Sequence, residues 1–331
     1  MAGSTATDPA LVARFKAALD RLNPSGGTIG LAVSGGPDSM AMLLLAVEAI
    51  PGGFEVATVN HGLRPEAKGE CALVVAACEA RGVPCKVLSV EVGEGNVQAK
   101  ARRARYDALG GWARRQGLAS VATAHHADDQ AETLLMRLNR ASGIDGLAGI
   151  RERLEMPFDG FGPGTIFPLI RPLLGFRRAE LLGVVDAAGL PFATDPSNAD
   201  EAYDRVRMRT ALADAEWLDP GAIAASAGHL ADALEALNHA FEPFFRDCMR
   251  YREHDGEVDI WLTLPADTPR YFRFAAVDRA LRGVGGDPRG GEVARLVERL
   301  DRGESGNVAG ALVTVEGGEW HFRREPPRRS G

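Results

Sequence analysis

Residues 34–39 read Ser34-Gly35-Gly36-Pro37-Asp38-Ser39, directly after an apolar run at residues 28–33 and directly before an apolar segment that ends at Ala49. This order predicts a strand, a glycine-rich turn and a helix. Backbone N–H groups at a helix start have no intrahelical partners, and the helix dipole adds partial positive charge there. The turn is therefore suited to hold a phosphate or pyrophosphate without a lysine. The alternative is a tight turn whose glycines serve only the fold.

The residue types in this turn favour a nucleotide. Gly35 and Gly36 permit a close backbone approach that a Cβ would block. The hydroxyls of Ser34 and Ser39 add donors, and the carboxylate of Asp38 is suited to hold Mg²⁺ against phosphate oxygens. The Lys-Ser/Thr pair of P-loop NTPases is absent, and so is the third glycine of the dinucleotide fingerprint. We predict that the whole turn, including Pro37, binds the cofactor.

Strands and helices are predicted to alternate after this turn. Further strands are expected at residues 54–59, 85–90 and 120–124, and helices at 66–81, 97–116 and 129–140. This alternation predicts an α/β fold with a doubly wound parallel sheet, whose ligand crevice lies beyond the carboxyl ends of the strands. Asn60, His61 and the run His125-His126-Ala127-Asp128-Asp129 follow strand ends. We therefore expect them beside the phosphate turn.

Chain length and pattern predict a second domain. The 331 residues suffice for about two domains. We expect the first at residues 1–215 and a mainly helical one at 216–331, with helices at 271–281 and 292–300 and a small hairpin at 312–322. A glycine- and proline-rich passage at residues 158–172 predicts a mobile loop.

Bulk composition limits the class of protein. The sequence has no 18-residue apolar run and no basic, apolar leader, so we expect a cytoplasmic protein that does not contact membranes. Its four cysteines form no C-x-x-C pair and are expected to be packing thiols. The net charge of −7 argues against a nucleic-acid partner, but arginines cluster at residues 102–115, 137–153 and 205–209. Such clusters are either a basic binding surface or solvated helix faces.

The run from His125 to Thr133 is dense in groups that bind metal or move protons. Asp129 and Glu132 fit a D-x-x-E capping box, which is a purely structural role. Beside a phosphate turn, however, carboxylates could coordinate Mg²⁺, and a histidine could donate or accept a proton. Both interpretations stay open from these residues alone.

Several motifs together resemble one enzyme family. The turn resembles the SGGxDS loop of the N-type ATP pyrophosphatases. The wider set occurs in the order of the tRNA(Ile)-lysidine synthetase family over roughly residues 28–215: SGGPDS, VNHGLRPEA, ARRARY, HHADDQAETLLMRLNRASG, RPLL, TDPSN and RVRMR. The resemblance implies that ATP adenylates the C2 oxygen of the wobble cytidine in an isoleucine tRNA with a CAU anticodon, releasing pyrophosphate. L-lysine then displaces AMP and leaves lysidine.

The resemblance also implies roles for single residues. The pyrophosphate would lie against Ser34 to Ser39, with Asn60 and His61 at the nucleotide, and Mg²⁺ would be held by Asp38 and Asp128. Residues with catalytic roles would be Asp38, Arg105, His125, Asp129 and Arg209. His125 is preferred to His126 because His125 and Asp129 are four residues apart at the start of a helix.

Other functions fit part of the pattern. A tRNA thiolase would require sulfur-carrying cysteines, and an amide-forming synthetase would require a glutaminase domain or ammonia tunnel. A noncatalytic adenine-nucleotide sensor would need the turn but not the acidic run. The second domain is expected either to bind tRNA or to be a helical packing domain; its candidate contacts are Arg246, Arg250, Tyr251, Arg270, Tyr271 and Arg273. The sequence leaves a homodimer open.

Overall fold

The computed structural model describes residues 7–62, 66–91, 97–158, 165–194 and 204–326. The chain divides into two compact units, Met1–Asp232 and Ala233–Gly331. This division falls inside a long helix, α9 (Pro220–Cys248). The functional boundary expected between residues 215 and 216 stays a prediction.

A six-stranded sheet forms the centre of the first unit, with the strand order β3-β2-β1-β4-β6-β5. Neighbouring strands among β3, β2, β1, β4 and β6 pair in parallel. The edge strand β5 pairs with β6 in the antiparallel direction. The predicted doubly wound α/β fold is confirmed. The strands are β1 (Ile29–Ala32), β2 (Phe54–Asn60), β3 (Cys85–Ser89), β4 (Ser120–Ala122), β5 (Arg153–Pro157) and β6 (Ile166–Ile170).

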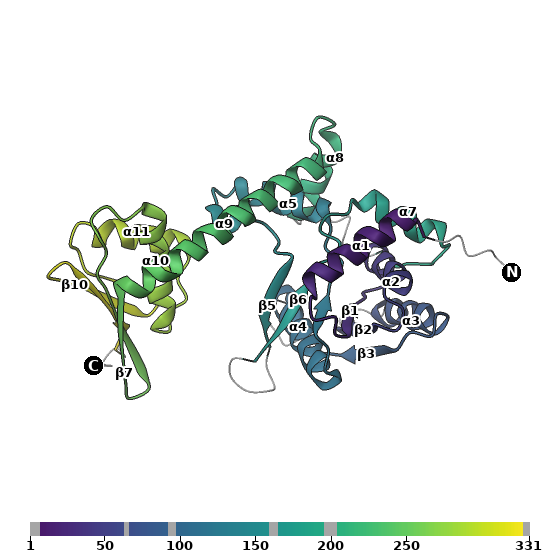
Figure 1. Cartoon of the computed structure of the whole chain (residues 1–331), viewed down its shortest axis with the longest axis horizontal. Helices are drawn as coiled ribbons and strands as arrows, with labels where there is room; N and C mark the ends of the chain where they lie inside the picture. Colours follow the sequence, from purple (N-terminus) through teal and green to yellow (C-terminus); the bar gives the residue numbers. More distant parts are fainter. Residues whose placement is uncertain (1–6, 63–65, 92–96, 159–164, 195–203, 327–331) are drawn as a thin grey trace. The chain divides into compact units, whose positions relative to one another are not determined.

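Helices cover both faces of this sheet. One core joins the strands to α1 (Pro9–Leu22), α2 (Pro37–Ala49), α3 (Glu66–Glu79) and α7 (Arg178–Ala187), and Figure 1 shows α2 beside α1 and α7. A second core joins the strands to α4 (Val97–Gln116). Ala122 belongs to the first core and Val121 to the second, as the alternation of side chains along a strand requires.

Close packing of α4 depends on a glycine in β1. A Cβ on Gly30 would lie 2.5 Å from the ring of Trp112, which is 2% exposed. The remaining helices of the first unit are α5 (Ala127–Leu138), α6 (Ile144–Leu147) and α8 (Asp204–Asp214), and α8 packs against α5.

The mobile loop expected at residues 158–172 is wrong for its second half. Residues 166–170 form β6, whose Phe167, Leu169 and Ile170 are buried. Glycine and proline in the passage concealed a hairpin with β5. Residues 159–164 lie outside the described part of the chain.

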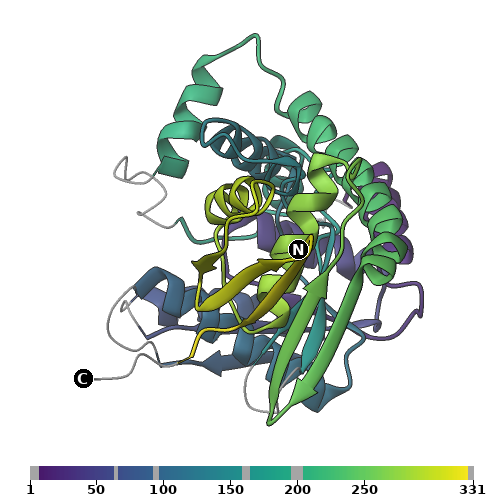
Figure 2. The same cartoon turned by 90° about the vertical axis from the view of Figure 1, so that its left-hand side faces the viewer.

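The second unit contains a five-stranded antiparallel sheet with the order β7-β8-β11-β10-β9. Figure 2 shows the β7–β8 hairpin in green and the β10–β11 hairpin in yellow. The predicted C-terminal hairpin is confirmed as β10–β11, and so are both predicted helices. The elements are β7 (Met249–His254), β8 (Glu257–Leu262), α10 (Arg270–Gly283), α11 (Gly290–Leu300), β9 (Gly306–Val308), β10 (Ala311–Glu316) and β11 (Glu319–Arg324).

Two further properties concern the chain as a whole. Within the described residues, no helix has the length and apolar character needed to cross a bilayer. All four cysteines are free; Cys71 and Cys78 are buried, and Cys85 and Cys248 are half-buried. Their packing role is thus confirmed for the two buried thiols.

Candidate active site

The serines of the phosphate turn form hydrogen bonds within the turn itself. Ser34 N donates to Ser39 Oγ at 3.1 Å, and Ser39 Oγ donates to the Gly36 carbonyl at 2.9 Å. Gly35 has a φ of 88°, a left-handed conformation that favours glycine, and a Cβ there would lie 3.1 Å from the Glu70 carbonyl oxygen. The turn leads directly into α2, which begins at Pro37 with Gly36 as N-cap. Its shape is therefore set by backbone geometry and a hydroxyl network.

A cavity of about 520 Å³ opens at the carboxyl ends of β1 and β4, next to this turn. These two strands are neighbours at the centre of the sheet, where the strand order reverses, so the cavity lies at the topological switch point. Ten predicted site residues line it: Ser34, Gly36, Pro37, Asp38, Ser39, His61, Arg105, His125, Asp129 and Arg209. Glu70, His126, Arg178 and Arg205 line it as well.

Three predicted site residues do not line the cavity. Gly35 lies in the turn, where its carbonyl accepts from Ala193 N at 2.9 Å. Asn60 Oδ1 accepts from Gly62 N at 2.9 Å. Asp128 Oδ2 accepts from Arg178 N at 2.8 Å and faces the Arg177 guanidinium. The contacts of Asp128 favour a positioning role, and its predicted role as a metal ligand stays untested.

His126 lies among three carboxylates; sequence analysis placed it beside the phosphate turn but preferred His125 as the catalytic histidine. Its ring is 3% exposed, with Nε2 at 3.6 Å from Asp38 Oδ2 and 3.5 Å from Asp129 Oδ2, and Nδ1 at 3.6 Å from Asp128 Oδ2. Burial disfavours the charged ring, but Asp128 and Asp38 outweigh burial and raise the pKa of His126 to about 9. The pKa of the Asp128 carboxyl is correspondingly held well below its usual range, against the effect of burial. His126 is therefore a cation that joins both strand-end motifs.

His125 has the opposite environment. Its Nδ1 lies 3.0 Å from Thr123 Oγ1. Burial and then the nearby guanidiniums of Arg171 and Arg205 lower its pKa to about 3. His125 is therefore a neutral ring in the cavity at physiological pH, able to exchange hydrogen bonds without carrying charge.

The helix α5 begins earlier than expected, and the D-x-x-E capping box is wrong. Asp129 Oδ2 accepts from the backbone N of His126, the N-cap, at 3.1 Å. Glu132 is therefore not a cap, and its carboxylate instead accepts from Arg205 Nε and Arg209 Nε, both at 2.8 Å. Glu132 is 2% exposed, and this partnership raises the pKa of Arg209. A buried acid thus fixes two arginines from α8 at the cavity.

Comparison with known proteins identifies the family. A family model described as a PP-loop domain matches residues 9–216. A tRNA(Ile)-lysidine synthase of Novosphingobium aromaticivorans is 46% identical over 96% of this chain and 94% of its own length. The chain belongs to the tRNA(Ile)-lysidine synthase family. The lysidine synthases of Zymomonas mobilis and Ruegeria pomeroyi are each 39% identical, over 93% and 90% of this chain and 91% and 71% of their own lengths. The family resemblance drawn from the motifs is confirmed.

The fold of this chain is also found outside its family. A U34-tRNA thiolase of Methanococcus maripaludis superposes with a TM-score of 0.53, at 17% identity over 70% of this chain and 80% of that one. This likeness concerns the fold alone. Asn198, from the TDPSN motif, lies outside the described residues.

The carboxylates of the cavity are of a kind that suits a phosphate-bound magnesium ion. Asp38 Oδ1 is buried without a hydrogen-bond partner. Within the described residues, no three or more His, Cys, Asp or Glu side chains form a metal-binding group. Mg²⁺ is commonly held by one or two carboxylates together with substrate phosphates and water. The residues present therefore suit an ion that arrives with a nucleotide.

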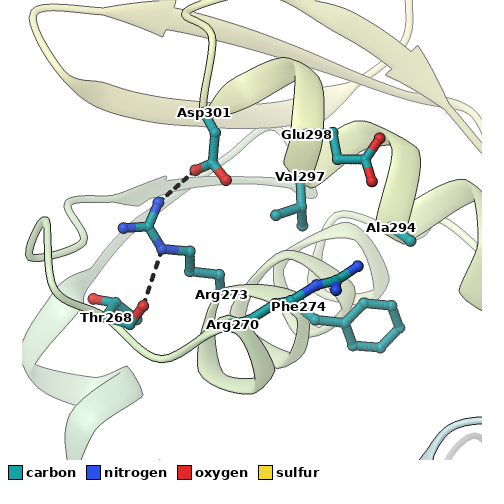
Figure 3. A pocket seen from close by; sticks show the side chains of 8 residues that line it. All are labelled: Thr268, Arg270, Arg273, Phe274, Ala294, Val297, Glu298 and Asp301. Atoms are coloured by element: carbon teal, nitrogen blue, oxygen red, sulfur yellow. Dashed lines mark hydrogen bonds and ion pairs between the residues drawn. The ribbon is translucent and has the colours of Figure 1, made fainter.

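In the second unit, Arg273 has a structural role. It lines a cavity of about 430 Å³ between α10 and α11, and Figure 3 shows its side chain there. Its Nε donates to the Thr268 carbonyl at 3.1 Å, Nη2 donates to the Ala266 carbonyl at 2.6 Å, and Nη1 pairs with Asp301. Arg270, one of the other candidate tRNA contacts, is exposed at the same cavity.

Proposed function

We propose that this protein joins L-lysine to C2 of the wobble cytidine in an isoleucine tRNA with a CAU anticodon, at the expense of ATP. The family supplies the reaction class. The observation that carries the assignment is one cavity that brings together the phosphate turn, the carboxylates of Asp38 and Asp129, and the arginines held by Glu132. A nucleotide sensor would have no need of the last two groups.

In the first step, the cytidine O2 attacks the α-phosphorus of ATP, and pyrophosphate leaves. The turn at residues 34–39 would hold the departing pyrophosphate at the start of α2. Asp38 would hold Mg²⁺, which neutralises phosphate charge when bound. His126, cationic among its carboxylates, keeps Asp38 and Asp129 in place beside the turn. Activation is needed because the pyrimidine O2 is a poor leaving group until it carries a phosphoryl group.

In the second step, the lysine Nζ attacks C2, the C2–O bond breaks, and AMP leaves. The lysine ammonium must first lose a proton. Asp129, a carboxylate that lines the cavity, would accept this proton. Arg105, Arg205 and Arg209 would stabilise negative charge that develops on the departing phosphate. Their rigid placement would matter more than their affinity for free AMP.

The decisive experiment is ATP-dependent incorporation of labelled lysine into an isoleucine tRNA transcript with a CAU anticodon. The control is the same transcript with the wobble cytidine changed to uridine. We expect label only in the cytidine transcript, and loss of it with Asp38→Ala. Pyrophosphate release without incorporation would point to another acceptor, and neither signal would favour a nucleotide sensor.

The proposed reaction also implies which molecules the protein binds and in which cell compartment it acts. ATP with Mg²⁺, lysine and the tRNA would be the partners, and a tRNA substrate is met in the cytoplasm. The homodimer that the sequence leaves open stays a prediction.

A further inference from the structure

One tryptophan of the first unit is almost fully exposed. Trp217 is 83% exposed, whereas Trp112 and Trp320 are buried and Trp261 is half-buried. An indole gains its stabilising effect by leaving water, so the fold itself does not explain Trp217. The side chain is available to a partner with an aromatic or apolar face.

The turn that carries Trp217 is fixed at both ends. Leu218 N donates to the Ala215 carbonyl at 2.8 Å, which closes the turn after α8. Asp219 Oδ1 then accepts from Gly221 N at 2.9 Å at the start of α9 and from Arg177 Nη1 at 2.9 Å. The indole is therefore presented by an ordered segment, so that binding to it would cost little ordering entropy.

Ion pairs connect this turn to the active site. Arg177, which binds Asp219, also places Nε 3.5 Å from Asp128 Oδ2. Asp128 in turn contacts His126. Two ion pairs in series thus link the turn to the carboxylate cluster around His126. The helix α8, which precedes the turn, also places Arg205 and Arg209 at the cavity.

The other end of α8 is basic. The side chains of Arg140 and Arg207 are 62% and 63% exposed, and both pair with the single carboxylate of Asp204. Two guanidiniums on one carboxylate leave a net positive charge at the surface. The eleven residues of α8 extend about 16 Å at a rise of 1.5 Å per residue, so one short helix joins this charge to Trp217.

We propose that Arg140, Arg207 and Trp217, here called the α8 strip, bind the unpaired anticodon nucleotides that flank the wobble cytidine. This inference rests on the proposed function. Unpaired RNA bases stack on aromatic side chains and their phosphates pair with guanidiniums. Trp217 stacks on one flanking base, while Arg140 and Arg207 contact the backbone. The wobble base itself enters the cavity between the α8 arginines and the phosphate turn.

The test measures binding of an anticodon stem-loop RNA with a CAU anticodon to the full chain. Stacking on Trp217 quenches its emission, so RNA should quench the wild type and Trp217→Phe should lose most of that quenching while it retains affinity. Trp217→Ala should bind about 5- to 100-fold more weakly, as expected for the loss of one stacked base. Because the side chain is exposed, both variants should fold normally.

A second arm tests the phosphate contacts. Arg207→Gln should make the logarithm of affinity less steep in the logarithm of salt by about one phosphate contact. The matched control is Ile166→Ala, which removes another exposed apolar side chain, 54% exposed, from β6 of the first unit. We expect it to leave stem-loop affinity and quenching unchanged.

Either of two results would overturn the inference: equal quenching in the wild type and Trp217→Phe, or unchanged affinity in Trp217→Ala. These readouts need neither ATP nor lysine. If the wild type binds the stem-loop through Trp217 but ligates no lysine, the proposed function fails and the RNA surface stands. If it ligates lysine and Trp217→Ala binds normally, the α8 strip fails alone.

Discussion

Two adjacent histidines at the cavity differ in charge, one cationic and one neutral, because one faces carboxylates and the other faces guanidiniums. His126 is surrounded by Asp38, Asp128 and Asp129, whereas His125 is half-buried near the guanidiniums of Arg171 and Arg205. The cationic ring bridges carboxylates that would otherwise repel one another. The neutral ring can contact substrate without adding to the positive charge of the arginines.

The charge of His126 makes stability depend on pH. Its pKa of about 9 in the folded chain lies above the ordinary 6.5. The stabilisation is therefore complete below pH 6.5, declines as the pH rises, and is lost above pH 9. For His126→Gln we expect this alkaline decline, at most about 3 kcal/mol in the free energy of unfolding, to disappear. Urea denaturation between these pH values measures it.

The control for that experiment is His229→Gln, which changes an exposed histidine of α9. It should keep the wild-type pH profile. An unaltered alkaline decline in His126→Gln would show that other groups cause it.

Glu132 should control ligation without a direct role in the chemistry. Glu132→Gln retains the shape of the side chain but leaves Arg205 and Arg209 without their buried anion. We expect the rate of lysine ligation to fall about 100-fold, because small displacements of positioned groups have effects of this size. Single-turnover incorporation of labelled lysine measures it. Glu242→Gln breaks an exposed pair with Arg279 and should have no effect; equal rates in both variants would contradict the role of Glu132.

Residue types and their order were enough to predict most of the residues that line the cavity. They were not enough to predict which of these side chains pair with one another. The sequence could not tell which of His125 and His126 faces the carboxylates, because that depends on where α5 begins. A start at Ala127 rather than Asp129 makes His126 the N-cap and frees Glu132 for the arginines. The Arg-Val-Arg-Met-Arg spacing at residues 205–209 did place Arg205 and Arg209 four apart on one helix face, a signal that points to Arg205.

At the scale of elements, the left-handed residue of the phosphate turn should be the sensitive one. We expect Gly35→Ala to lower the free energy of unfolding by about 1–2 kcal/mol and to reduce pyrophosphate release, because its φ of 88° disfavours a Cβ. Gly36 has a φ of −72°, and a Cβ there would meet only Ser34 Oγ at 3.8 Å. Gly36→Ala should therefore fold with wild-type stability. Urea denaturation compares the two, and equal losses would contradict the backbone argument.

Elements with strong periodicity were predictable, and those without it were not. The alternating strands and helices around the first turn follow from apolar runs bounded by glycine. β7 could not be predicted, because its residues from Arg250 to His254 are all exposed and show no apolar alternation. β6 was concealed because glycine and proline precede it, although its own residues are apolar.

At the scale of the whole molecule, two arginines of the second unit should differ in their contribution to stability. Arg273→Gln loses bonds to two carbonyls and a carboxylate, so we expect the free energy of unfolding to fall by about 1–3 kcal/mol. Arg270→Gln changes an exposed side chain and should stay within about 0.5 kcal/mol of the wild type. Thermal and urea unfolding of the full chain measure both. Equal stability of the two variants would contradict the structural role of Arg273.

Gly30, at the centre of the first sheet, is a further position at which mutations should lower activity. Any side chain at Gly30 would displace Trp112, and Trp112 lies two turns along α4 from Arg105. A mutation there would touch no substrate, yet it would move an arginine at the reaction centre. A genetic screen for weakened decoding of isoleucine codons should therefore return position 30 together with the active-site residues.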